Sequence, residues 1–382
     1  MPADEPGPGR AADGASGPDD LSALVQEASR QLTICNACRY CEGLCAVFPA
    51  LERRSSLGLG DVSQLANLCH DCRACFDSCM YTSPHVFDLN VPRALSSVRV
   101  RDYQRYVWPR RVPAALAGWR GLVLLAAAAS ALLILVAIGH AGVRGLVAAD
   151  GGPQSPYALI PYPALLGIVG APALFAVAVT IAAGLRYWSE IGGAPDGWRL
   201  RPVLQGFWHA ATLRYLKGGG AECYYPDEEV PSAARRRLHA FTAYGFAMCM
   251  VSTLSAGIMQ DILGVSPPYG WLSVPVLSGT VGGMSLAVGC FGLLSAKLRA
   301  SQEPAAAQVT IKDYGLLAAL GFLAISGLAT LLTRSTGAFG LVFLVHMAAV
   351  VLATAAAPYS KFIHFVFRIL ALIRDSLERD AL

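Results

Sequence analysis

Charged residues are scarce in this sequence. Only 15% of its 382 residues are Asp, Glu, Lys or Arg, compared with about 25% in typical soluble proteins, while 54% are hydrophobic. This composition excludes an ordinary soluble protein. The net charge is also small, at +4, and the basic residues follow the boundaries of the hydrophobic segments, so they do not indicate a nucleic-acid partner.

Other expected features are missing from the N-terminal part of the chain. Residues 1–20 have no aromatic side chain and are rich in Pro, Gly, Ala and Asp, so we expect a disordered tail. Residues 21–111 have no G-x-G-x-x-G fingerprint, which argues against a flavin or nicotinamide site on this chain. No secretory-signal pattern precedes the cysteines, and this disfavours disulfides, which persist in oxidising compartments.

Cysteine, by contrast, is abundant and patterned. Eight of the eleven cysteines form two runs, Cys35-x2-Cys38-x2-Cys41-x3-Cys45 and Cys69-x2-Cys72-x2-Cys75-x3-Cys79. A [4Fe–4S] cluster needs four thiolates, and in two-cluster ferredoxins the fourth cysteine of each run binds the other cluster. The spacing therefore predicts two clusters with crossed ligands. The predicted ligand sets are Cys35, Cys38, Cys41 and Cys79 for the first cluster, and Cys69, Cys72, Cys75 and Cys45 for the second.

Structural zinc and disulfides are the alternatives for these cysteines. Four-cysteine zinc sites usually consist of two separated pairs, unlike a run at i, i+3 and i+6. The runs also depart from ferredoxins, where proline often follows the fourth cysteine, because Ala46 and Met80 stand there. Proline is not a ligand, so this is a variant of the pattern.

The cysteine-containing segment is predicted to be helical. Leu21, Leu24, Ala28 and Leu32 recur at helical spacing before the first run, and 46–68 has few β-branched residues and no hairpin signal. We therefore expect an all-α protein with a small helical di-[4Fe–4S] domain at 21–111. His70 and His85, near the second run, could tune a cluster through a hydrogen bond to sulfur, but a polar surface histidine is the more common case.

Long apolar stretches dominate the remainder of the chain. Each is close to the roughly 20 residues that a helix needs to cross a bilayer, and small residues inside them suit close helix packing. They predict a six-helix transmembrane domain at 115–364, followed by a helix at 365–382. The predicted spans are 121–138, 165–185, 241–263, 274–294, 316–332 and 339–357.

Basic residues predict the orientation of these helices. Arg and Lys accumulate before the first span, in the 186–237 loop, between the fourth and fifth spans and after the sixth, whereas the alternate loops hold few. By the positive-inside rule, both termini and the cluster domain face the cytoplasm of a cell inner membrane.

Three histidines are candidate haem ligands. His239 and His364 are predicted at similar depth on the cytoplasmic side, where they could hold one b-type haem or serve as interfacial hydrogen-bonding residues. His346 lies 364 − 346 = 18 residues before His364, which is five helical turns or about 27 Å, with Pro358 between them. At its depth the third span offers only Met259, so the sequence favours a single haem.

Several short motifs together resemble the tricarballylate utilization protein B family, also called the citrate utilization protein B family. The match spans about 30–375. Ala240 and Gln260 stand where members of this family often carry histidine. The motifs are the two cysteine runs, YLKGGG at 215–220, CYYPDE at 223–228, RRRLH at 235–239, YGF at 244–246, PPY at 267–269 and PYSKFIH at 358–364.

The resemblance implies a membrane electron-transfer protein. It would reoxidise the FAD of a soluble tricarballylate dehydrogenase-like partner through two [4Fe–4S] clusters and haem b, with quinone as acceptor. The membrane part is similar to the b-type cytochrome subunit of nitrate reductases. The alternative is an iron–sulfur and haem component of oxygen-dependent cobalamin biosynthesis, since a related protein fuses flavin and iron–sulfur halves. In either case the chain is an oxidoreductase component without a substrate-binding flavin domain of its own.

Overall fold

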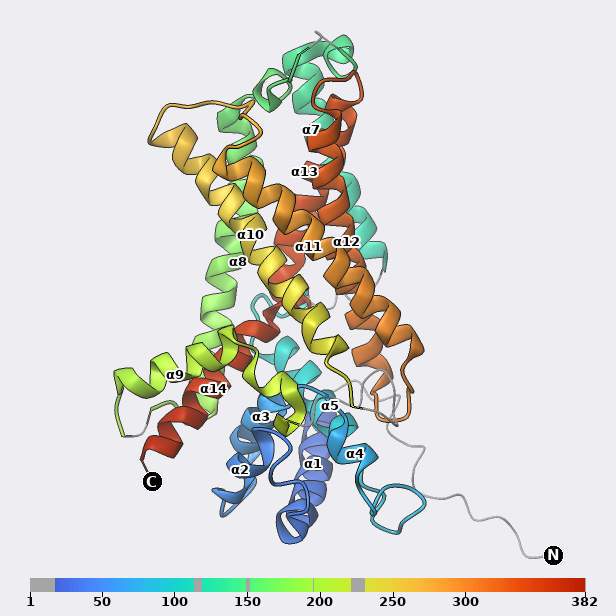
Figure 1. Ribbon diagram of the computed structural model, residues 1–382, viewed down its shortest axis with the longest axis vertical. Helices are drawn as coiled ribbons and strands as arrows, with labels where there is room; N and C mark the ends of the chain where they lie inside the picture. The colour runs from blue at the N-terminus through green and yellow to red at the C-terminus, as the bar shows by residue number, and fades with distance from the viewer. Residues whose placement is uncertain (1–17, 113–118, 149–151, 195, 221–230, 382) are drawn as a thin grey trace, which may run out of the picture.

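The computed structural model describes residues 18–112, 119–148, 152–194, 196–220 and 231–381. These residues form helices and turns without a strand, which confirms the all-helical prediction. A helical head lies at one end of a long bundle, and the C-terminal helix returns to that same end (Figure 1). Nearly all of the predicted tail at 1–20, and the family motif at 223–228, lie outside the described residues.

Six helices in the described part of the chain are long and apolar enough to cross a membrane, as predicted, and the chain is a multi-pass membrane protein. Except for the last, each helix is longer than the apolar span predicted from the sequence. Polar and aromatic residues at the ends extend the helix beyond the length that crosses the hydrocarbon. The helices are α7 Trp119–Gly145, α8 Tyr162–Glu190, α10 Ala234–Asp261, α11 Val274–Arg299, α12 Ala307–Thr333 and α13 Phe339–Ala356.

Helices α10 and α11 approach each other at a seam of glycines. A Cβ atom added to Gly245 would lie 2.5 Å from the Leu286 nitrogen, and one added to Gly289 would lie 2.5 Å from the Thr242 nitrogen. Such distances leave no room for a side chain, so the two backbones are in contact. Small residues at helix interfaces allow this packing in lipid, as the sequence suggested.

The head is built from short helices around a buried apolar core. Ala28 and Leu32 on the first helix, Leu65 on the third and Leu95 on the fifth are all fully buried. The fifth helix begins where the Asn90 side chain accepts a hydrogen bond from the Arg93 backbone, an N-cap that fixes its start. The head helices are α1 Pro18–Cys38, α2 Val47–Glu52, α3 Leu59–Leu68, α4 Ala74–Asp77 and α5 Val91–Arg105.

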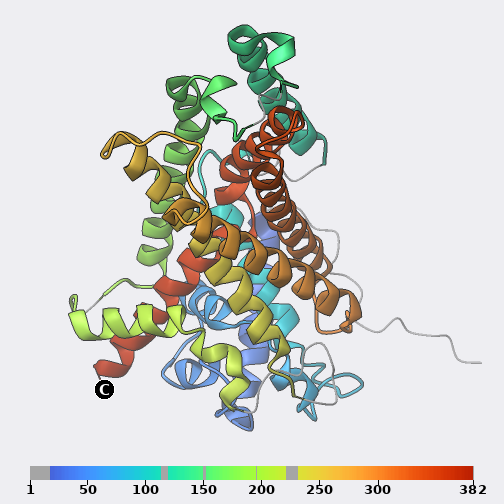
Figure 2. The same cartoon turned by 45° about the horizontal axis from the view of Figure 1, so that its top comes forward.

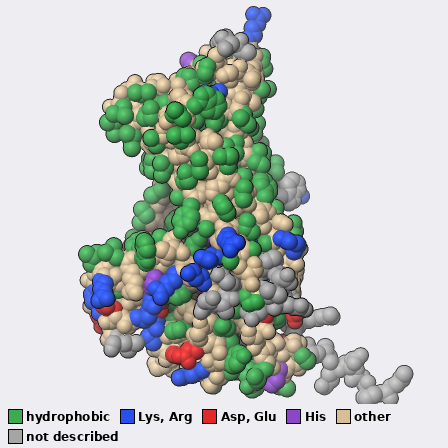
Figure 3. Space-filling model, in the orientation of Figure 1, with side chains coloured by type: hydrophobic (Ala, Val, Ile, Leu, Met, Phe, Trp, Pro, Cys, Tyr) green, Lys and Arg blue, Asp and Glu red, His purple; other side chains and the backbone are tan. Residues whose placement is uncertain are grey.

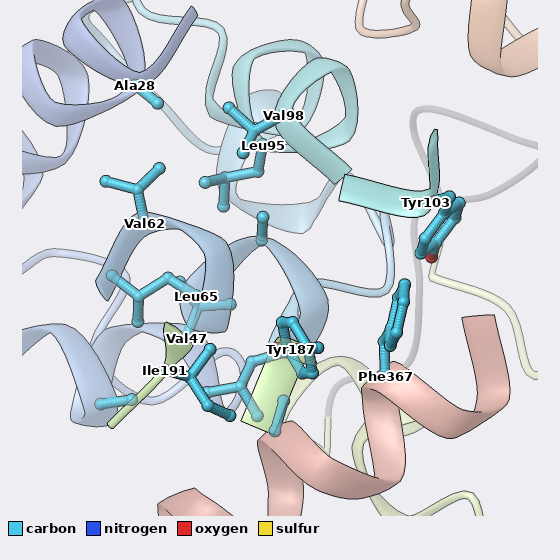
Figure 4. Close-up of a cluster of buried hydrophobic side chains, with 14 of the residues drawn as sticks. Ala28, Val47, Val62, Leu65, Leu95, Val98, Tyr103, Tyr187, Ile191 and Phe367 are labelled. Carbon is cyan, nitrogen blue, oxygen red and sulfur yellow. The ribbon is translucent and has the colours of Figure 1, made fainter. Parts of the chain in front are cut away.

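The core of the head also includes side chains from the bundle and the C-terminus. Tyr187 of α8 and Phe367 of α14 (His364–Asp380) are fully buried, with ring centroids 4.7 Å apart, and Tyr103 of α5 lies 5.5 Å from Phe367 (Figure 4). A partly buried ion pair of 2.7 Å joins Arg54 to Glu378 near the end of α14. The head and the end of the bundle therefore form one packed body.

Helix α9, Leu200–Ala211, lies beside α14 at the junction of head and bundle (Figure 1 and Figure 2). Its outer face exposes Leu204, Phe207 and Trp208, whereas His209 is buried and lies 2.9 Å from an Arg214 nitrogen. An exposed apolar face on a helix at this level is typical of a segment that lies on a membrane surface. Lys and Arg side chains also gather mostly on the half of the molecule that contains the head (Figure 3).

Candidate functional site

The first predicted cysteine set surrounds a cavity at the outer part of the head. Cys35, Cys38, Cys41 and Cys79 all line it, together with Cys75. We call this the distal cavity. Cys38 is exposed, so the cavity reaches the surface. The other lining residues are uncharged, namely Tyr40, Phe48, Phe76, Met80, Tyr81, Leu89 and Val91.

The second predicted set surrounds a cavity on the side of the head that faces the bundle. Cys45, Cys69, Cys72 and Cys75 line it, and Cys75 therefore borders both cavities. Cys72 is buried and belongs to an apolar cluster with Ala296 and Ala300 at the end of α11. We call this the proximal cavity. Its lining also includes His70, Asp71 and Arg73.

The cysteine-bearing turns follow from local structure. Cys35 and Cys38 lie in the last turn of α1, while Cys69 caps the end of α3. Three cysteine sulfurs each accept a hydrogen bond of 3.4 Å from the backbone N–H group two residues later in the chain. The pairs are Val47 to Cys45, Asp71 to Cys69, and Tyr81 to Cys79. Hydrogen bonds to sulfur are one of the ways in which proteins tune an iron–sulfur cluster.

Ionisation of the buried cavity thiols requires a compensating positive charge. Burial, followed by the neighbouring cysteines, raises the pKa of Cys35 and Cys45 to about 12, and that of Cys41 to about 11. Without a compensating charge these thiols stay protonated at neutral pH. Iron binding supplies that charge, and the thiol protons leave as it binds.

The donor set is one that iron–sulfur clusters use, because thiols line both cavities. Among the described residues, no three His, Cys, Asp or Glu side chains lie closely enough together to hold a single metal ion. The thiols instead line two separate cavities, each with four predicted ligands on its wall. The crossed assignment stays a prediction, and the positions of Cys79 and Cys45 agree with it.

The histidine pair lies where the bundle meets the head. The rings of His239 and His364 have centroids 6.4 Å apart and are nearly perpendicular, at 88°. With imidazole–metal bonds of about 2 Å, two imidazoles on opposite sides of one ion have centroids roughly 6 Å apart. This spacing therefore fits a haem iron between them.

The hydrogen bonds of the pair also suit metal binding. His364 Nδ1 donates to the Lys361 carbonyl at 2.8 Å, which leaves Nε2 with its lone pair, as is usual for ligating histidines. Burial, with the charges of Lys361 and Arg368, lowers the pKa of His364 to about 3, so its imidazole is neutral. His239 Nδ1 is buried without a hydrogen-bond partner among the described residues.

His346 is in a different environment. Its Nδ1 lies 3.0 Å from the Ser326 hydroxyl, and its ring lies against Gly327 of α12. The continuous helix assumed between His346 and His364 is not present, because α13 ends at Ala356 and two 3-10 turns precede α14. Pro358, in the first of these turns, has no N–H to continue the helix, so the estimate of 27 Å does not hold. His346 is hydrogen-bonded within the bundle, apart from the paired histidines.

Comparison with known proteins identifies the family. A family model described as citrate utilization protein B matches residues 116–382, and one described as its Fer4-like domain matches 28–105. The chain belongs to the citrate utilization protein B family. A citrate utilization protein B from Escherichia coli is 35% identical over 354 residues, covering 92% of each chain. No solved structure matches the chain.

Membership of the citrate utilization protein B family confirms the resemblance read from the motifs. The Fer4-like domain indicates an iron–sulfur electron-transfer role, and its match contains both cysteine runs. The citrate utilization protein B match begins just before α7 and contains all six spans, so the two matches correspond to the head and the bundle.

Sequence reasoning missed the residues that hold the proximal cavity. His70, expected at the surface, is only 6% exposed and bonds to the Leu68 carbonyl at 3.0 Å. Arg99, Arg235 and Arg368 donate to backbone carbonyls of the Cys69–Asp71 turn, a role that the sequence analysis did not assign to them. The sequence contained one signal of this role, since Arg235 and Arg368 each lie four residues from a predicted haem histidine.

Proposed function

We propose that this protein carries electrons from the reduced FAD of a soluble dehydrogenase to quinone, through two [4Fe–4S] clusters and one haem b. The main support for this proposal is that two cysteine cavities and a histidine pair with ligand-like spacing lie in one packed body at one end of the bundle. Cysteines would hold the clusters, and His239 with His364 would hold the haem.

The exposure of the two cavities supports a direction of transfer. The distal cavity reaches the surface at Cys38, where a soluble flavoprotein can approach, whereas the proximal cavity contacts the bundle through Cys72. Reduced FAD releases two electrons and two protons. The thiols of the two cavities and the pair of His239 and His364 would hold groups that transfer electrons singly, and quinone would take up two electrons and two protons to become quinol.

The substrate class of the donor comes from the family. The relative from Escherichia coli is named for citrate utilization, and tricarballylate differs from citrate by one hydroxyl. We propose a tricarballylate dehydrogenase-like flavoprotein as donor. In this proposal the chain's own residues hold the electron carriers, and the donor provides the substrate pocket.

The proposed location is the inner membrane, with the head and both termini in the cytoplasm. The support is the gathering of Lys and Arg on the half of the molecule with the head. Reporter fusions test it: a fusion after Gly270 should report the periplasm, and one after Gly219 the cytoplasm. A periplasmic signal at Gly219 would reverse the topology and remove the donor's access to the head.

Purification in detergent followed by iron, sulfide and haem assays with EPR tests the cofactors. We expect about eight irons and eight sulfides in clusters and one haem per chain, since each cluster has four of each. Addition of the reduced flavoprotein should then reduce a water-soluble quinone. Clusters and haem without quinone reduction would contradict the proposed acceptor, and absence of clusters would refute the proposal.

A further inference from the structure

Three arginines from three helices hold the turn that carries the proximal cysteines. Arg368 of α14 donates to the Cys69 carbonyl at 2.6 Å, and Arg99 of α5 donates to the same carbonyl and to the Ala66 carbonyl at 3.1 Å. Arg235 of α10 donates to the His70 carbonyl at 2.5 Å and to the Asp71 carbonyl at 2.9 Å. Because guanidinium groups bind these carbonyls in fixed directions, the turn is tied to both the head and the bundle.

Two of these arginines are neighbours of the histidine pair. Arg235 precedes His239 by four residues on α10, and Arg368 follows His364 by four residues on α14. Residues four apart lie on the same face of a helix, about 6 Å along its axis. Each histidine therefore lies about one helical turn from an arginine that contacts the Cys69–Asp71 turn.

Within the described part of the chain, Arg99 and Arg368 hydrogen-bond to backbone carbonyls and not to carboxylates. Among the described residues, neither arginine forms an ion pair with a carboxylate. Arg368 also lies 2.9 Å from His70 Nδ1. In contrast, Arg54 and Arg374 pair with Glu378 at 2.7 Å. Arg99 and Arg368 thus place positive charge beside the proximal cavity, whose wall also contains Asp71 and Arg73, whereas the residues that line the distal cavity are uncharged.

Resting on the proposed function, we propose that Arg235 and Arg368 are positioning residues that lock the proximal cluster to the histidine pair and raise its reduction potential. Reduction adds one negative charge to the cluster. A nearby guanidinium stabilises the more negative, reduced form, and net charge is one of the factors that set cluster potentials. The proximal cluster is then the one that exchanges electrons with the bundle.

Redox titration followed by EPR on the intact protein in detergent tests this inference. The proximal signal is the one lost in Cys72→Ser, since Cys72 lines only that cavity. Arg368→Gln and Arg235→Gln should each lower its midpoint potential by about 59 mV, a tenfold change for one electron, and leave the distal signal in place. Arg368→Lys keeps the charge and should retain most of the potential.

Arg374→Gln is the matched control. Arg374 lies on the same helix as Arg368 and also donates to a backbone carbonyl, but this carbonyl is that of Gly193, at 2.8 Å, and not one of the Cys69–Asp71 turn. It should leave both potentials unchanged. If Arg368→Gln does not accumulate in the membrane, the midpoint potential of the proximal signal in Arg235→Gln tests the inference instead.

The two proposals fail in different ways. An unchanged proximal potential in both glutamine variants, with both clusters assembled, overturns this inference alone. Equal shifts of both clusters also overturn it, because the charge would then act on the head as a whole. Absence of [4Fe–4S] signals from the unmodified protein refutes the proposed function.

Discussion

The two cysteine cavities have the same ligand spacing but different surroundings. The distal cavity is bordered by Tyr40 and Met80, each 68% exposed, and reaches solvent at Cys38. In the proximal cavity Cys72 is 8% exposed, and arginines from α5, α10 and α14 hold the neighbouring turn. A repeated motif thus supplies the same chemistry twice, and tertiary packing makes one copy accessible and the other connected to the bundle.

The largest effect should come from removing a cysteine that the crossed assignment gives to the cluster of the other run. Cys45→Ser should abolish or strongly perturb the cluster of Cys69, Cys72 and Cys75, because Cys45 lines that cavity although it belongs to the first run. Its EPR spectrum should resemble that of Cys69→Ser more than that of Cys35→Ser. If Cys45→Ser disturbs only the other cluster, the crossed assignment is wrong.

In the proposed function, a haem held by the histidine pair links the proximal cavity to the bundle. His239→Ala and His364→Ala should each abolish the b-type α band of the dithionite-reduced protein, since either leaves the iron with one protein ligand. His346→Ala is the control and should keep most of the band, because His346 is hydrogen-bonded to Ser326. Loss of the band in His346→Ala alone would place the haem elsewhere in the bundle.

The difference in exposure should appear as a difference in oxidative damage. On brief treatment with ferricyanide, the distal cluster should be lost several-fold faster than the proximal one, because solvent and oxidant reach it at Cys38. EPR of the re-reduced protein after timed exposure measures both rates in one sample. Equal rates would mean that the two cavities do not differ in access.

The smallest effect concerns a buried carboxyl beneath the proximal turn. Burial raises the pKa of Asp102 to about 7, despite hydrogen bonds from Ser63 at 2.7 Å and Asn67 at 3.2 Å. Because the unfolded chain ionises near its ordinary value of 3.8, the free energy of unfolding falls between about pH 4 and 7, and is flat above. The loss is at most about 4 kcal/mol, from 1.36 kcal/mol per pKa unit.

Substitution of this carboxyl tests the pH effect. Asp102→Asn should flatten the pH dependence of the temperature at which the proximal EPR signal is lost, since an amide does not ionise. Asp88→Asn, at an exposed position near the distal cavity, serves as the control and should keep the slope. A slope that persists in Asp102→Asn would assign the effect to other groups.

Local patterns in the sequence were sufficient for the coarse structure. Cysteine spacing, apolar stretches of membrane length and the absence of strand signals predicted two cysteine sites, six spans and an all-helical fold. These features depend on residues close together in the chain. The pairing of His239 with His364 was also predicted, because helix depth can be counted along the sequence.

Features that depend on tertiary contacts were not predicted. Arg99 and Arg368 are separated from each other by most of the chain, yet both bind the carbonyl of Cys69. Burial of His70 likewise depends on Tyr215, whose backbone carbonyl contacts its ring. A basic residue at a membrane boundary has the same sequence signature whether it faces solvent or holds a buried turn.

The shared core of head and C-terminus has a consequence for biosynthesis. Phe367, Ala371 and Leu372 of α14 are buried among residues of α1, α3 and α5, so the apolar interior of the head is incomplete without them. During translation the cysteines emerge early, whereas α14 is made only after all six spans. Stable packing of the head, and with it protection of the proximal cavity, must therefore wait until α14 has emerged. A ribosome-stalled or C-terminally truncated chain would have all eight cysteines but an unfinished site.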